Sequence, residues 1–312
     1  MGPQIRTWFE IPDTAYEGHE NPSPTADELA QFTDAFLMKL EDSSPKDQNH
    51  LVDLLEELVG MNLPLLAVKL VDAYPQLFPE SDFRAQLHLG NAAMLVSDLS
   101  RAESAFIEAQ RLIPEEPAPY VNLTQIYCYD GLLDKAREWC DAGLNAEPNN
   151  PRLWELLAWL EQQDEKARGG NITSVANEIS KLAQTKNSWA GMSLACDLKD
   201  PEDVGTKVSI LETFWDEGCR DTDYLIEFTA VLGMAGRYDR IPMIFWQVEK
   251  QSSQGLPWQL SVHLAQAFLG LGREADAKAV LLKLNDMIEL PENARQITSA
   301  LLNEIQDSST PS

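Results

Sequence analysis

The sequence predicts an all-α fold built from stacked antiparallel helix hairpins. From Thr25 to Asp307, apolar residues recur at spacings of three and four, the period of an amphipathic helix, and no segment shows the strict alternation of a strand. Gly, Pro or Asn residues end the helical segments, and Pro79, Pro114 and Pro148 lie 35 and 34 residues apart. Helix pairs that recur at a fixed interval indicate a solenoid of repeats.

Residues 1–24 differ in composition from the rest of the chain. Four prolines prevent a continuous helix there, whereas Trp8, Phe9 and Ile11 are unusual for a disordered tail. We expect an extended segment that docks, through these three residues, on the chain's own repeats or on a partner.

Residues 25–306 are predicted to form the solenoid, with about seven hairpins and a capping helix at each end. The opening cap is expected at Ala26–Asp42 and the closing cap at Glu292–Gln306. Such caps cover the apolar faces that the terminal hairpins would otherwise expose. Residues 307–312 are expected to form a disordered tail.

The middle of the solenoid follows the repeat pattern weakly. A helix is expected at Arg152–Glu165, and Gly169, Gly170 and Asn171 interrupt the chain before a second helix begins near Thr173. The segments Ser188–Cys196 and Pro201–Glu217 are predicted to form a degenerate hairpin. Regular hairpins resume at Tyr224–Lys250 and Trp258–Leu284, with Gly236 and Gly272 at turns that need a left-handed backbone.

Two consecutive segments show the repeat most clearly. The first carries Leu89, Gly90, Ala102, Phe106, Ala109 and Pro114, and a shift of 34 residues leads to Leu123, Thr124, Ala136, Cys140, Gly143 and Pro148. The small residues are predicted to lie where helices cross, the aromatic residue and the second alanine to pack the hairpin onto its neighbour, and the proline to end the second helix.

This pattern resembles the tetratricopeptide repeat family. The resemblance implies a right-handed α-solenoid, in which the first helices of successive hairpins line a concave groove that binds peptides. It covers residues 47–160 and 220–290 better than the region between them. It also implies a protein–protein interaction scaffold or adaptor rather than an enzyme.

Counting from the landmarks gives the side chains expected to face this groove. They are Arg84, His88, Asn91, Met94, Asn122, Gln125, Tyr129, Arg152 and Trp159. Family members that clamp a peptide's terminal carboxylate use two Asn, two Lys and an Arg.

Only part of that carboxylate clamp is present in this sequence. Asn91 and Asn122 match the two Asn positions and Arg152 offers a cation, but Leu87 and Leu156 occupy the remaining positions. An internal or extended peptide is therefore the expected ligand, because Asn side chains can pair with a peptide backbone.

The composition restricts the partners further. The chain holds 50 Asp and Glu against 24 Lys and Arg, a net charge of −26. Such a surface repels nucleic acid and anionic lipid, and it either attracts a basic protein partner or simply keeps the chain in solution. No apolar run approaches the length of a membrane span, and the first residues lack a signal peptide, so a cytoplasmic location is expected.

No motif for catalysis, a metal or a cofactor emerges. The four cysteines form no C-x-x-C pair, and the four histidines, His19, His50, His88 and His263, are far apart in the sequence. A glycine-rich phosphate loop and a nucleophile elbow are also absent from the sequence. We therefore expect no enzymatic activity.

Three functions remain open. The first is an adaptor that grips a peptide or partner protein in the groove. The second is a self-regulated switch, in which residues 1–24 compete for that groove. The third is a structural subunit of a larger assembly, with contacts spread beyond the groove. The sequence leaves the oligomeric state undetermined.

Overall fold

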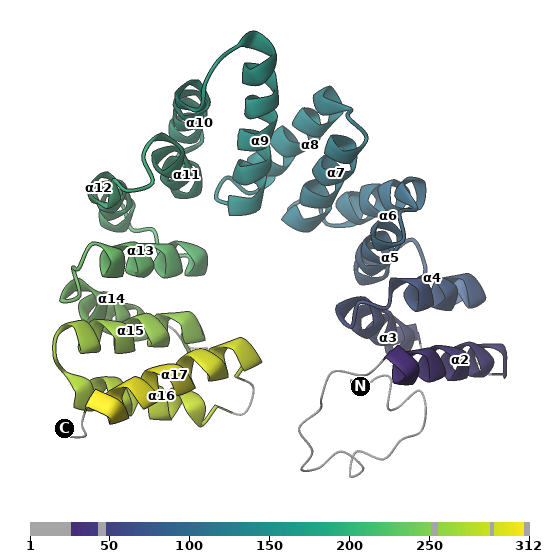
Figure 1. Ribbon diagram of the computed structural model, residues 1–312. Helices are drawn as coiled ribbons and strands as arrows, with labels where there is room; N and C mark the ends of the chain where they lie inside the picture. Colours follow the sequence, from purple (N-terminus) through teal and green to yellow (C-terminus); the bar gives the residue numbers. More distant parts are fainter. Residues whose placement is uncertain (1–25, 43–47, 251–254, 288–289, 309–312) are drawn as a thin grey trace. The chain divides into compact units, whose positions relative to one another are not determined.

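The computed structural model describes residues 26–42, 48–250, 255–287 and 290–308 (Figure 1). In these residues every regular element is helical, and no strand occurs. The α-helices are α2 (Ala26–Asp42), α3 (Gln48–Gly60), α4 (Pro64–Ala73), α5 (Phe83–Leu95), α6 (Leu99–Leu112), α7 (Pro117–Tyr129), α8 (Leu133–Ala146), α9 (Pro151–Arg168), α10 (Ile172–Lys186), α11 (Trp189–Lys199), α12 (Val204–Asp216), α13 (Thr222–Met234), α14 (Arg240–Glu249), α15 (Trp258–Gly270), α16 (Glu274–Asn285) and α17 (Glu292–Ser308). A short 3₁₀ helix, η2, spans Pro75–Leu77.

The predictions for the two ends of the chain fall largely outside the described residues. The docking segment with Trp8, Phe9 and Ile11 lies there, as do residues 309–312. The closing helix α17 begins where the sequence predicts and continues to Ser308, past the expected end at Gln306.

The chain divides into two compact units, Met1–Leu160 and Glu161–Ser312. In the N-terminal unit, the consecutive pairs α3–α4, α5–α6 and α7–α8 each pack as a hairpin, and α5 also contacts α3 and α7. The first helices of successive hairpins therefore lie next to one another, as the repeat pattern predicts.

Polar caps and left-handed residues define the ends of these helices. The carboxylates of Asp82 and Asp98 accept hydrogen bonds from the third backbone N–H of α5 and α6, at 3.1 and 3.2 Å. The turns inside the three hairpins contain Asn62, Ser97 and Gly131 at φ of 57°, 63° and 72°. A left-handed residue lets the chain reverse directly after a helix.

The proline landmarks are bound by side chains at one repeat position. Gln86 Nε2 donates to the carbonyl oxygen of Pro79 at 3.4 Å, and the Tyr120 hydroxyl donates to that of Pro114 at 2.8 Å. The indole of Trp154 makes the equivalent contact in the next repeat. The three donors are 34 residues apart, so each hairpin holds the turn that precedes it.

The small residues lie where helices approach closely, as predicted. A Cβ atom on Gly90 would lie 2.5 Å from the ring of Phe106, in the same hairpin. One on Gly143 would lie 2.7 Å from Leu153 in the following helix. The aromatic residue was predicted to pack on the neighbouring hairpin, whereas its ring packs on Gly90 and fills the crossing inside its own hairpin.

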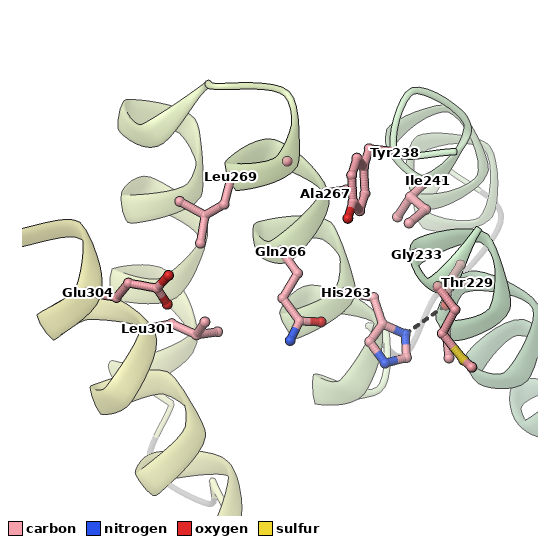
Figure 2. Close-up of a pocket in the computed structure, with 13 residues that line it drawn as sticks. Thr229, Gly233, Tyr238, Ile241, His263, Gln266, Ala267, Leu269, Leu301 and Glu304 are labelled. Atoms are coloured by element: carbon pink, nitrogen blue, oxygen red, sulfur yellow. Dashed lines mark hydrogen bonds between the residues drawn. The ribbon is translucent and has the colours of Figure 1, made fainter. Parts of the chain in front are cut away.

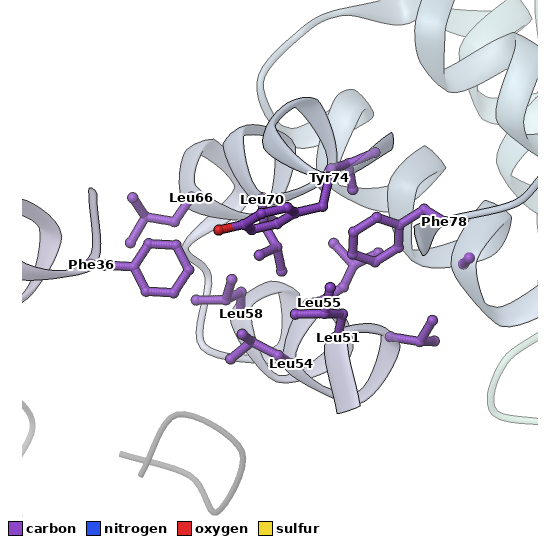
Figure 3. Packing of buried hydrophobic residues seen from close by; sticks show 14 residues of the cluster. Phe36, Leu51, Leu54, Leu55, Leu58, Leu66, Leu70, Tyr74 and Phe78 are labelled. Carbon is purple, nitrogen blue, oxygen red and sulfur yellow. The ribbon is translucent and has the colours of Figure 1, made fainter. Parts of the chain in front are cut away.

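The opening helix α2 caps the apolar end of the N-terminal unit. Its Phe36 is fully buried beside Leu66 of α4 and Leu58 of α3, in the same apolar cluster as Leu51 and Leu54 (Figure 3). Burial of a large apolar side chain contributes roughly 1.5–3 kcal/mol. The cap is therefore an integral part of the core of this unit.

The C-terminal unit regains the 34-residue register after a less regular start. α10 packs closely on α11, and α11 packs on α12, so the predicted degenerate hairpin is part of a longer stack. Asn187, at φ of 50°, makes the turn between α10 and α11. The glycines of the two last hairpins, Gly236 and Gly272, have φ of 68° and 70°, which confirms the predicted left-handed turns.

Polar side chains connect the first helices of this unit. Ser193 on α11 donates to Glu227 on α13 at 2.9 Å, and these residues are 34 apart. Glu227 also pairs with the largely buried ammonium of Lys207, at 2.7 Å. Thr229 on α13 and His263 on α15 are bonded at the same 34-residue spacing. α11, α13 and α15 therefore occupy equivalent repeat positions. α17 packs on α15 and α16 and closes the stack.

Candidate functional site

The predicted groove residues lie on α5, α7 and α9 of the N-terminal unit. We call this surface the first-helix face. Its candidate residues are Arg84, His88, Asn91, Met94, Asn122, Gln125, Tyr129, Arg152 and Trp159. All of them are exposed or half-buried, so the structure leaves each accessible to some extent.

The two asparagines predicted to contact a ligand are hydrogen-bonded to each other. Asn122 Nδ2 on α7 donates to Asn91 Oδ1 on α5 at 3.1 Å. This bond fixes the orientation of both amides. After it forms, Asn91 still has two N–H groups, and Asn122 has one N–H group and its carbonyl oxygen. The pair therefore presents donors and an acceptor, as a peptide backbone requires.

Arg84 is held by carboxylates of the preceding hairpin. Its Nη2 lies 2.7 Å from Asp53 Oδ1 and 2.6 Å from Glu56 Oε2. The hydrogen bond to Glu56 is the main cause that raises the pKa of Arg84, and the bond to Asp53 follows. Two carboxylates around one guanidinium leave this end of the face acidic, so it suits a cationic ligand group better than an anionic one.

His88 lies beside this ion pair. Its Nε2 is 3.5 Å from Glu56 Oε2, and its Nδ1 is buried without a hydrogen-bond partner in the described part of the chain. Burial lowers the pKa of His88 despite the opposing effect of Glu56. The imidazole is therefore neutral at pH 7 and leaves the acidic character of the cluster unchanged.

The other end of the face carries exposed aromatic side chains. Tyr129 is 80% exposed and Trp159 is 41% exposed. Arg152 Nη1 pairs with Glu155 Oε2 on its own helix at 2.7 Å. Leu156, at a position where a carboxylate clamp needs a cation, is buried.

A second candidate site lies in the C-terminal unit, where the sequence indicated none (Figure 2). It is an open pocket of about 570 Å³ between α13, α15 and α17, closed on one side by Tyr238 and Ile241. Gly270 makes room for the Tyr238 ring, since a Cβ atom there would lie 2.5 Å from it. The pocket is formed by the first helices of this unit and by the closing helix.

The hydrogen bond between Thr229 and His263 determines which ring nitrogen of His263 carries the proton. Thr229 Oγ1 lies 2.8 Å from the Leu225 carbonyl oxygen and 2.8 Å from His263 Nδ1. Two oxygens this close need a proton between them, so the hydroxyl donates to the carbonyl and accepts from the imidazole. The neutral ring therefore carries its proton on Nδ1, and Nε2 has a lone pair.

Burial favours the neutral form of this imidazole. It lowers the pKa of His263, although the charge of Glu227 acts in the opposite direction. Figure 2 shows Nε2 on the ring edge away from Thr229, on the side where Gln266 and Glu304 also line the pocket. The pocket thus presents acceptors in the form of a ring nitrogen, an amide oxygen and a carboxylate.

Sequence reasoning missed this pocket because it treated the histidines as isolated residues. The available signal was the 34-residue spacing of Thr229 and His263, which places two polar residues at one repeat position on neighbouring first helices.

No group of three or more His, Cys, Asp or Glu side chains in the described segments could hold a metal ion. The four cysteines form no disulfide bond in the structure, and burial raises the pKa of Cys128, Cys196 and Cys219. No helix within the described ranges is long and apolar enough to cross a membrane.

Comparisons with known proteins agree with the repeat architecture. Residues 93–160 match the family model described as tetratricopeptide repeat. No curated protein matches the chain. A tetratricopeptide repeat protein from Parabacteroides merdae is similar in structure, at 14% identity over 83% of this chain and 98% of that chain, with a TM-score of 0.42.

Two further solved structures are similar. Yeast Tom70 shares 15% identity over 93% of this chain and 63% of that chain, with a TM-score of 0.48. YrrB, described as a TPR protein with an unusual peptide-binding site, shares 15% identity over 74% of this chain and 97% of that chain, with a TM-score of 0.29. Residues 93–160 thus match the tetratricopeptide repeat, and helix hairpins with the same 34-residue register recur in the C-terminal unit.

Proposed function

We propose that this chain is a non-enzymatic interaction scaffold that binds an extended peptide segment of a partner protein on its first-helix face. The observation that carries the proposal is the amide pair of Asn91 and Asn122, which joins α5 to α7 and retains donors and an acceptor. An extended peptide has one N–H and one C=O group per residue, and an asparagine amide can pair with both.

The side chains around this pair support an apolar and basic peptide. Tyr129 and Trp159 offer aromatic surface to apolar ligand side chains. Arg84 and its two carboxylates, Asp53 and Glu56, give the other end an excess of negative charge. The net charge of −26 would also steer a basic partner toward the protein.

A cytoplasmic location is part of the same proposal. None of the four cysteines forms a disulfide bond in the structure, which is common in a reducing compartment. Cell fractionation tests this location directly. Recovery of the chain with secreted or periplasmic proteins would contradict it.

Affinity purification with a double variant tests the binding proposal. Tagged full-length chain is recovered from its native cell, and partners are identified by mass spectrometry. Asn122→Ala combined with Arg152→Glu should remove the partner while the chain stays folded, because both side chains are half-buried or exposed. Full recovery of the partner by the double variant would overturn the assignment of the face.

Arg111→Glu supplies the matched control. Arg111 lies on the second helix α6 and pairs with Glu108 at i,i+3, as Arg152 pairs with Glu155. The control therefore makes the same charge reversal away from the first-helix face. The partner should remain bound to this variant. If Arg111→Glu lost the partner to the same extent, the loss would be a nonspecific effect of the charge reversal.

A further inference from the structure

The pocket between α13, α15 and α17 combines several hydrogen-bond acceptors with the donors of the Gln266 amide and the Tyr238 hydroxyl, and it has no cationic side chain. Its acceptors are the Nε2 lone pair of His263, the amide oxygen of Gln266 and the carboxylate of Glu304. Among the thirteen residues that line it, none is Lys or Arg. An anionic ligand would therefore meet a carboxylate and a lone pair without a compensating cation.

The walls of the pocket complement an aliphatic chain. Met234, Leu269 and Leu301 line it from three different helices, and the Tyr238 ring closes one side. A lysine or arginine side chain combines an apolar stem with a cationic head that only donates hydrogen bonds. Such a side chain fits both the walls and the acceptors.

We propose that this pocket binds the basic side chain, lysine or arginine, of a partner peptide. The stem lies against the apolar walls, and the cationic head donates to the Glu304 carboxylate. His263 Nε2, which Figure 2 shows on the other side of Gln266, accepts a hydrogen bond from a donor of the same peptide. The excess of acidic residues over the whole chain favours approach of such a peptide. The proposal deepens the proposed peptide-binding function, but it concerns the C-terminal unit and depends on neither Asn91 nor Asn122.

The orientation of His263 is part of the proposal. The bond to Thr229 positions the imidazole and places its proton on the nitrogen that faces away from the ligand. His263 is thus both a contact residue and a fixed acceptor. A long-range proton–nitrogen NMR spectrum of the full chain, labelled at its four histidines, should show the Nδ1-protonated tautomer for His263. Protonation on Nε2 in the free protein would contradict this step.

A peptide mixture tests the ligand class. Immobilised full-length chain is incubated with twenty blocked heptapeptides that share the sequence Ser-Ala-Leu-X-Leu-Ala-Ser and differ only at X. The bound peptides are counted by mass spectrometry. Peptides with X as arginine or lysine should be enriched about tenfold over glutamine, as expected for a charge-assisted hydrogen bond. Enrichment of acidic or purely apolar peptides, or no enrichment, would overturn the proposal.

Variants assign the enrichment to this pocket. Glu304→Gln, at an exposed position, should lower the preference for basic peptides without unfolding the chain. Glu292→Gln, also exposed on α17, is the matched control and should retain the preference. The readout is the difference between Glu304→Gln and Glu292→Gln, so its failure is distinct from failure of the first-helix face. An unchanged preference in Glu304→Gln would refute the pocket assignment.

Discussion

Trp154 donates its indole N–H to the carbonyl oxygen of Pro148 at 2.8 Å. The side chain is fully buried at the start of α9, and the proline lies in the turn that follows α8. Tyr120 makes the same contact with Pro114 one repeat earlier. A recurring hydrogen bond of this kind fixes the angle at which each hairpin leaves the previous one. The repeat is thus specified by polar contacts as well as by apolar packing.

Trp154→Phe should lower the free energy of unfolding by about 2 kcal/mol, because it removes this hydrogen bond and leaves part of the indole volume empty. The measurement is urea denaturation followed by circular dichroism. Trp246→Phe on α14 is the control, since Trp246 is 46% exposed, and it should change stability by less than about 0.5 kcal/mol. Equal effects of the two variants would argue against a structural role for the bond.

Gly90→Ala should destabilise the N-terminal unit. The new Cβ atom would lie 2.5 Å from the buried Phe106 ring, and overpacking of this kind costs roughly 1–3 kcal/mol. The better helix propensity of alanine offsets up to about 1 kcal/mol of that cost. Thermal melts of both variants test this prediction. In Gly205→Ala on α12, the control, the new Cβ atom meets only an ordinary contact at 3.8 Å, so this variant should be as stable as the parent or more stable. A Gly90→Ala protein as stable as the parent would show that Phe106 can move aside.

His263 should make stability depend on pH. Burial lowers its folded pKa below the unfolded value of about 6.5, so the unfolded state binds more protons between these two values. The contribution is therefore fully present above pH ~6.5 and is lost as the pH falls toward the folded pKa. Denaturant melts between pH 7.5 and 5.5 should show this loss.

His263→Asn should flatten part of that pH dependence, because an asparagine amide can still donate to Thr229 but does not titrate. Burial also lowers the pKa of His88, so the variant should retain some of the slope. The negative charge of Glu227 opposes the lowering of the His263 pKa. Identical pH profiles of the parent and the variant would show that His263 is protonated equally in both states.

The architecture could be predicted from the sequence because its determinants are local. The prolines, the small residues at helix crossings and the glycines at turns can each be recognised within one repeat. In the structure, Gly90 lies at a helix crossing and Gly236 at a left-handed turn. The packing partner of Phe106 was less predictable, since an aromatic ring can fill a crossing inside a hairpin or between hairpins.

The candidate sites depend on contacts between repeats, which no single repeat specifies. The bond between Asn91 and Asn122 follows from the distance between α5 and α7, and the neutralisation of Arg84 depends on acids from the preceding hairpin. The pocket around His263 is formed by three helices, and the hydrogen bond to Thr229 determines the tautomer of its imidazole. Sequence spacing places such residues on a face but leaves their partners and protonation undetermined.

Site-specific photocrosslinking in the native cell tests most directly whether the first-helix face binds a partner. Benzoylphenylalanine is introduced in turn at Tyr129 and Trp159 on this face, and at the control position Ile107 on α6, which is 39% exposed. The account predicts that both face positions crosslink to one short segment of a single partner protein, whereas Ile107 does not. Equal crosslinking from Ile107, or no crosslink from either face position, would contradict it.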